Sequence, residues 1–157
     1  MNTKLLKRSA GFSLVELMIA VIIMGLLTAI AVPIYMKAET KIQGNDAVSF
    51  LTSTAQKLED YYALHSTYPA SLSEIGIAEP ALDPWGNPYQ YMPIDIKPPP
   101  KTGKIRRDKN MNPLNTDFDL YSYGPDGRSQ TQLTANFARD DIVRAGNGSF
   151  IGTAQDF

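Results

Sequence analysis

Three aspartates near the end of the chain have the type and spacing best suited to chemistry. Asp126 lies in a Gly-Pro-Asp-Gly turn, and Asp140 and Asp141 form a pair just before Ile142. A tight turn and a returning segment can bring these carboxylates onto one hard cation, with carbonyl oxygens completing the roughly six to eight ligands that calcium accepts. Two alternatives stay open. Asp126 makes only an Asx turn while the pair faces solvent, or two carboxylates act as acid and base in hydrolysis, although the sequence shows no nucleophile motif.

A fourth carboxylate, Glu16, stands at the edge of an apolar run that contains no further charged residue until Lys37. That run is about as long as a helix needs to cross the hydrocarbon core of a bilayer. A carboxylate at this depth is costly unless it finds a partner or reaches the headgroups.

A short basic leader precedes this run and ends in Gly11, and its charged residues are Lys4, Lys7 and Arg8. An ordinary signal peptide has its small-residue cleavage site after the apolar region, which is then discarded. The opposite order here indicates that the apolar helix is kept. A conventional signal cleaved at Ala29-Ile30-Ala31 is the alternative.

The sequence Gly-Phe-Ser-Leu-Val-Glu from Gly11 to Glu16, with the apolar run up to Tyr35, resembles the class III signal of type IV pilins and type II secretion pseudopilins. The resemblance implies that a prepilin peptidase cuts after Gly11 and methylates the new N-terminus, Phe12. It also implies that Glu16 neutralises the amino group of Phe12 in a neighbouring subunit during assembly. The alternative for Glu16 is a carboxylate that rests at the headgroup level.

Two further motifs resemble the major pseudopilin of type II secretion. One is Asp-Pro-Trp-Gly-Asn-Pro-Tyr at residues 83–89, and the other is the Ser-x-Gly turn at residues 122–124 with the later acidic pair. This resemblance implies a structural calcium ion bound by the backbone carbonyl of Tyr123 and the side chains of Asp126, Asp140 and Asp141. A further ligand between residues 128 and 139 cannot be chosen among Ser129, Thr131 and Thr134.

Composition limits the possible functions. The 157 residues suit one domain plus a membrane helix, and loss of the leader moves the formal net charge from −1 to −4, because three basic residues leave with it. Nucleic acid is therefore not an expected partner. The chain has no cysteine, whereas many type IV pilins close their C-terminal region with a disulfide, so the absence favours a pseudopilin. The single histidine, His65, is expected at the surface at a helix end.

The pattern predicts a helix of roughly 50 residues up to about Ser66. Its second half carries an apolar stripe that should pack on a sheet, formed by Val48, Leu51, Ala55, Leu58 and Tyr62. Strands are expected near residues 89–91 and 118–123, and an edge strand near residues 149–151. The aromatic residues Trp85, Tyr89 and Tyr91 are expected to cover the helix, and a carbohydrate-binding row is the alternative.

Residues 97–116 contain three consecutive prolines and a cluster of basic residues, Lys101, Lys104, Arg106, Arg107 and Lys109. The composition predicts a long exposed loop or hairpin tip. The cluster is either a solvated loop or a positive face that meets acidic partners. The corresponding connection in pseudopilins is usually shorter, so the resemblance gives this insertion no role.

Taken together, the sequence predicts an α+β, pilin-like fold: a long N-terminal helix, membrane-spanning in its first half, packed on a small antiparallel sheet with a calcium-binding loop. Residues 1–11 are the leader, 12–35 the transmembrane and polymerisation helix, and 36–157 the periplasmic globular domain, with 36–66 completing the helix and 67–157 forming loops and sheet.

The expected function is that of a structural filament subunit, not an enzyme. The resemblance implies the major pseudopilin of a type II secretion system, anchored by one span in the bacterial inner membrane and assembled into a periplasmic filament. Its implied partners are copies of itself, minor pseudopilins, the prepilin peptidase and the inner-membrane assembly platform. A type IV pilin of a surface fibre for adhesion, motility or DNA uptake is the alternative.

Overall fold

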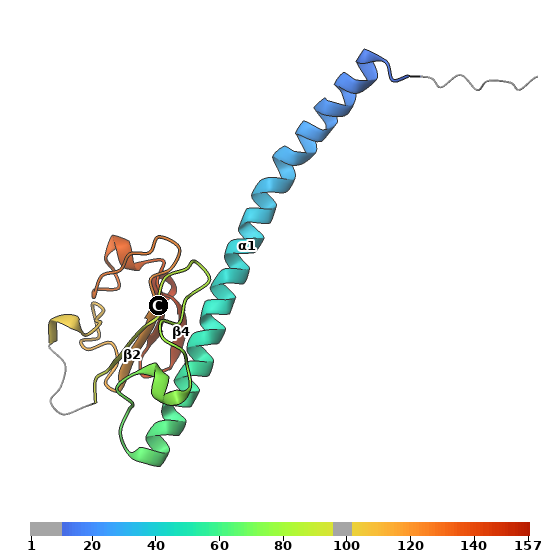
Figure 1. The fold of residues 1–157 in the computed structure, drawn as a ribbon. Helices are drawn as coiled ribbons and strands as arrows, with labels where there is room; N and C mark the ends of the chain where they lie inside the picture. The colour runs from blue at the N-terminus through green and yellow to red at the C-terminus, as the bar shows by residue number, and fades with distance from the viewer. Residues whose placement is uncertain (1–10, 96–101) are drawn as a thin grey trace, which may run out of the picture. The chain divides into compact units, whose positions relative to one another are not determined.

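The computed structural model describes residues 11–95 and 102–157 (Figure 1). The basic residues of the predicted leader lie outside this range. The chain divides into two compact units, Met1–Thr40 and Lys41–Phe157, and each unit is described by itself. The main elements are α1 (Leu14–His65), β1 (Gln90–Pro93), β2 (Phe118–Ser122), β3 (Ile142–Ala145) and β4 (Phe150–Thr153). Short 3-10 helices are η1 (Leu72–Ile75), η2 (Thr102–Lys104), η3 (Asn136–Ala138) and η4 (Ala154–Asp156).

The first unit contributes the apolar part of α1. Every side chain from residue 11 to residue 40 is exposed, and α1 contains an 18-residue stretch that is apolar enough to cross a membrane and has no buried residue. Pro33 lies inside the helix without ending it, although its ring nitrogen cannot donate to the carbonyl of Ala29. A helix that is apolar on all sides needs lipid or other protein around it.

The second unit is built on one antiparallel sheet with the strand order β1-β2-β3-β4. The strands therefore follow one another in space as they do in sequence, and each pairs with the next, for example Tyr91 with Leu120 and Val143 with Gly152. The predicted α+β, pilin-like fold is confirmed, with one long helix packed on a small antiparallel sheet.

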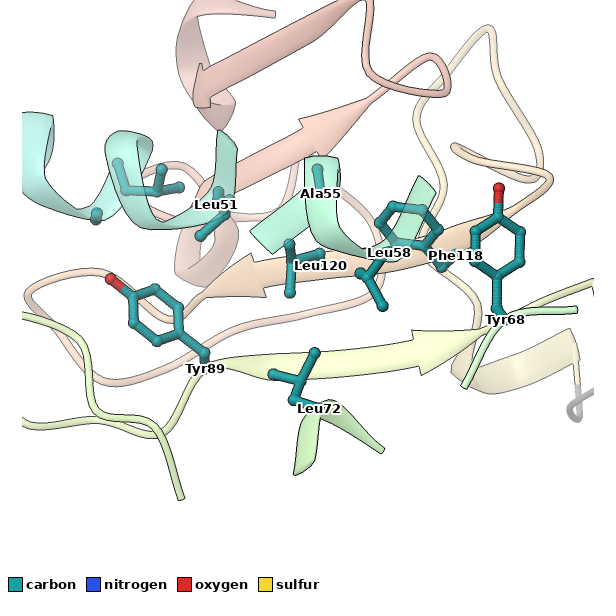
Figure 2. Packing of buried hydrophobic residues seen from close by; sticks show 10 residues of the cluster. Leu51, Ala55, Leu58, Tyr68, Leu72, Tyr89, Phe118 and Leu120 are labelled. Carbon is teal, nitrogen blue, oxygen red and sulfur yellow. The ribbon is translucent and has the colours of Figure 1, made fainter. Parts of the chain in front are cut away.

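The second half of α1 packs on this sheet through its predicted stripe. Figure 2 shows Leu51, Ala55 and Leu58 of the helix over Phe118 and Leu120 of β2, and all five side chains are buried. The stripe differs from the prediction at its edges, where Ala47 and Thr54 are buried too and Val48 is half-buried. The prediction that Tyr62 belongs to the core is wrong, because its side chain is 37% exposed and stacks on Tyr68.

The predicted aromatic cover of the helix is confirmed. Tyr89 is buried and stacks on Phe50 of α1, with ring centroids 4.0 Å apart. Trp85 and Tyr91 are partly buried against the same cluster. His65 lies exposed at the end of α1, as expected, where its ring stacks on Tyr61.

The opposite face of the sheet is covered as well. Side chains alternate between the faces of a strand, so Tyr121 and Val143 lie on the face away from the helix. There they join a second buried cluster with Leu114 of the insertion and Leu133 of the loop after β2. The prediction that the insertion is only an exposed loop is therefore wrong at Arg106, Leu114 and Asn115, which are buried. Lys104, Arg107 and Lys109 are exposed as expected, but Arg106 is 2% exposed. Residues 96–101, including Lys101 and the three prolines, lie outside the described range.

Three buried or partly buried tyrosines should make the stability of the protein depend on pH in the alkaline range. Burial raises the pKa of Tyr68, Tyr89 and Tyr91 above the ordinary value of 10.0. These tyrosines ionise near pH 10 in the unfolded chain but stay protonated in the folded one, so their contribution to stability is complete below pH 10 and is lost as the pH rises above it. In a titration of phenolate absorbance, we expect at least these three of the eight tyrosines to ionise late and together with unfolding. Ordinary titration of all eight in the folded protein would contradict this packing.

Candidate functional site

The start of α1 places Glu16 in a local hydrogen-bonding ring. The backbone N–H of Ser13 donates to Oε2 of Glu16 at 3.4 Å, and the backbone N–H of Glu16 donates to Oγ of Ser13 at 3.2 Å. This reciprocal pattern is a capping box, which satisfies two of the donors left open at a helix start. Sequence reasoning gave Glu16 an intermolecular partner and missed this one, although Ser-x-x-Glu before an apolar run is its known signal.

The turn after β2 lies against the acidic pair. Gly124 has a φ of +68°, and a Cβ atom there would collide with the backbone oxygen of Asp140, so only glycine fits this position. The backbone N–H of Asp126 donates to Oδ2 of Asp140 at 3.2 Å. Asp126 is exposed, and its Oδ1 accepts the backbone N–H of Arg128 at 2.7 Å, which is the Asx turn of the alternative interpretation.

Asp141 points elsewhere. Its side chain is fully buried, and Oδ2 accepts hydrogen bonds from Nη2 of Arg106 and from the hydroxyl of Ser129, each at 2.5 Å. Burial raises the pKa of Asp141 to about 6, an effect that the neighbouring guanidinium and hydroxyl oppose. The carboxyl is therefore still ionised at neutral pH and forms a buried ion pair with Arg106.

These positions test whether the predicted ligands fit one calcium ion. Asp126 and Asp140 are neighbours, but Asp141 turns toward a cation that the protein itself supplies. Within residues 11–95 and 102–157, no three acidic or histidine side chains gather in a way that could hold a metal ion. The arrangement does not fit a site made from all three carboxylates. The calcium site, with the carbonyl of Tyr123, stays a prediction.

Ser129 is the candidate for a further ligand that reaches the acidic pair, through its bond to Asp141. The other two candidates have different contacts. The backbone oxygen of Thr131 accepts the N–H of Arg107, and the hydroxyl of Thr134 accepts a bond from the side chain of Gln132.

The turn motif at residues 83–89 has a role that sequence reasoning missed. Asp83 is buried and accepts the backbone N–H groups of Trp85 and Asn87 and the hydroxyl of Ser122. The side chain of Asn87 donates to the carbonyl of Gly124 at 3.0 Å. The motif therefore fastens the turn before β1 to the turn after β2. An aspartate four residues before an asparagine in a Pro/Gly-rich turn was the available signal.

Comparisons with known proteins find one matching family and several similar sequences. The family described as the prokaryotic N-terminal methylation motif matches residues 6–32. The chain is 28% identical to the type II secretion system core protein G of Pseudomonas aeruginosa over 142 residues, which cover 78% of this chain and 87% of that protein. It is also 28% identical to the protein of the same name from Dickeya chrysanthemi over 165 residues, or 91% and 92% of the two chains.

The chain is also similar in sequence to a type IV pilin. The type IV major pilin protein PilE1 of Neisseria gonorrhoeae is 24% identical over 135 residues, which cover 86% of this chain and 72% of the pilin. No solved structure matches the chain significantly.

Proposed function

We propose, from the premise that this chain is a type IV pilin-like protein, that it serves as the major pseudopilin of a type II secretion system. In this role it is a structural subunit, not an enzyme. It assembles with copies of itself into a periplasmic filament that drives protein export across the outer membrane.

One observation carries this proposal: the similarity to core protein G extends over 91% of the chain and is not confined to the N-terminal motif. The motif alone at residues 6–32 is common to pilins and pseudopilins, so it cannot separate them. The similarity to core protein G beyond residue 32, together with the absence of cysteine from the sequence, is therefore what favours a pseudopilin.

The geometry supports a mechanical mechanism in the following way. Before assembly, the exposed apolar side chains of residues 14–35 are covered by lipid of the inner membrane, with the globular part in the periplasm. A prepilin peptidase removes the leader after Gly11 and methylates Phe12. Subunits then leave the membrane at the assembly platform, and the same apolar surface becomes the filament core. Contacts between different patches of successive subunits propagate without closing, as a helical filament requires. Minor pseudopilins are the other expected partners.

The carboxylate of Glu16 aligns neighbouring subunits when they assemble into the filament. In a helix surrounded by lipid its carboxylate needs a positive partner, and the amino group that cleavage exposes on Phe12 of a neighbouring subunit supplies one. The capping box with Ser13 holds the carboxylate at the helix start until that partner arrives.

A surface fibre is the second candidate, because the similarity to PilE1 also covers most of the chain. Deletion of the gene in its own host separates the two. The proposal expects exported proteins to accumulate in the periplasm, with surface fibres and twitching intact, and complementation to restore export. Loss of surface fibres with normal export would overturn the proposal in favour of a pilin.

A further inference from the structure

We propose that the guanidinium of Arg106 does in this chain the work that the family resemblance assigns to calcium: it holds the loop after β2 against the sheet through Asp141. The proposal concerns how the globular part is held together, and it stands whether the filament is a pseudopilus or a surface fibre. It would make the fold of this part independent of calcium.

The contacts of Arg106 join three segments that are distant in the sequence. Nη2 donates to Asp141 just before β3, and Nη1 donates to Ser129 in the loop after β2 at 2.8 Å. Ser129 in turn donates to the same oxygen of Asp141. The insertion, the loop and the sheet are thus tied at one buried point, as a metal ion would tie them.

The backbone around Arg106 is anchored independently of its guanidinium. Its N–H donates to Oδ2 of Asp119 on β2 at 2.9 Å, and its carbonyl accepts the N–H of Leu114 at 2.8 Å. The guanidinium carbon lies 4.0 Å from the ring centroid of Tyr121, which is close enough for a cation–π interaction. These contacts hold the Arg106 side chain near Asp141 in addition to the ion pair itself, so the pair alone does not have to restrict that side chain.

The pair and a calcium ion compete for the same carboxylate. Asp141 and Arg106 are 0% and 2% exposed, so neither charge can be screened by water. Oδ1 of Asp141 is buried without a hydrogen-bond partner among the described residues, and it is the atom through which a metal ion would still bind. A divalent cation bound at Oδ1 would share one carboxylate with the guanidinium, which is bound at Oδ2. Two positive charges this close together repel each other strongly in a buried site. The guanidinium therefore takes the place of the metal.

The insertion explains why this chain differs. Arg106 belongs to the segment of residues 97–116, which is expected to be longer than the corresponding connection in pseudopilins. This segment helps to cover the face of the sheet opposite the helix, together with the loop after β2. The insertion thus supplies both a part of the second apolar cluster and the cation that neutralises Asp141.

The first test compares thermal unfolding of the full chain in detergent with millimolar calcium and with a calcium chelator. A bound ion raises the melting temperature in proportion to the logarithm of its concentration over its dissociation constant. The proposal expects equal melting temperatures in both solutions. A rise of several degrees in calcium that disappears in Asp126→Asn and Asp140→Asn would overturn it and support the predicted calcium site.

The second test removes the cation. Arg106→Met should lower the melting temperature by roughly 10 °C or more, because it leaves a buried carboxylate without its partner. The matched control is its exposed neighbour Arg107. The variant Arg107→Met should change the melting temperature by less than about 2 °C. The double variant Arg106→Met/Asp141→Leu should lose less than the sum of the single variants. Equal effects of Arg106→Met and Arg107→Met, or simple additivity in the double variant, would overturn the proposal. If Arg106→Met fails to fold, the calcium comparison on the unaltered chain still decides.

Discussion

Replacement of Glu16 by glutamine is expected to abolish filament assembly while the subunit remains inserted in the membrane. Glutamine can occupy the same position in a capping box, so its side-chain oxygen can still accept the N–H of Ser13 and the helix start is kept. What it lacks is the negative charge that would meet the amino group of a neighbouring Phe12. Electron microscopy and fractionation of cells that overproduce the subunit measure the outcome.

Ser13→Ala is the matched control for this experiment. It removes the hydroxyl that accepts the N–H of Glu16 and costs about 1 kcal/mol at the helix start, but it keeps the carboxylate. We expect this variant to assemble. Filaments from Glu16→Gln at the level of the unaltered protein would show that the charge is not needed, and loss of filaments in both variants would assign Glu16 a role in helix capping instead.

The second large effect is expected at Phe118, in the centre of the helix-side core. Its side chain is fully buried, and its ring packs edge-on against Tyr68 at 5.0 Å and beneath the guanidinium of Arg144 at 3.9 Å. Phe118→Ala should lower the free energy of unfolding by about 3–5 kcal/mol, because it removes this apolar area and leaves a cavity. Denaturant unfolding of the full chain in detergent, followed by circular dichroism, measures the loss.

Phe137→Ala is the control, since Phe137 is 42% exposed and its ring meets the guanidinium of Arg128 at 5.2 Å. Its replacement should cost less than about 1 kcal/mol. Similar losses in the two variants would mean that the helix and β2 do not form the main core.

The sequence was most informative where one physical requirement dominates. The charge-free run after Glu16 and the spacing of Leu51, Ala55 and Leu58 predicted both halves of α1, because a membrane and a sheet each demand a simple apolar pattern. The strand after Pro88 and the strand before Gly124 were found because turn residues bound them.

The site was harder to predict for a physical reason. Whether a carboxylate meets a metal ion, water or an arginine depends on segments that folding brings together from far apart in the chain. Arg106 is 35 residues from Asp141 and lies in a basic stretch that resembles a solvated loop, so local composition gave the wrong environment for it. Its burial depends on alternation within β2 and β3, which places Tyr121 and Val143 on the face that the insertion covers. Asp83 was missed similarly, because its partner Ser122 is 39 residues away.

The proposed filament subunit is tested most directly by the intact mass of the protein isolated from its own host membranes. We expect a chain that begins at Phe12 and carries one added methyl group, because the proposed filament needs the apolar helix of residues 14–35 to be kept. A chain that begins at Val32, after the alternative Ala29-Ile30-Ala31 cleavage site, would lack most of that helix and would contradict a filament subunit of this kind. A chain that keeps its leader in a host with an active prepilin peptidase would contradict it as well.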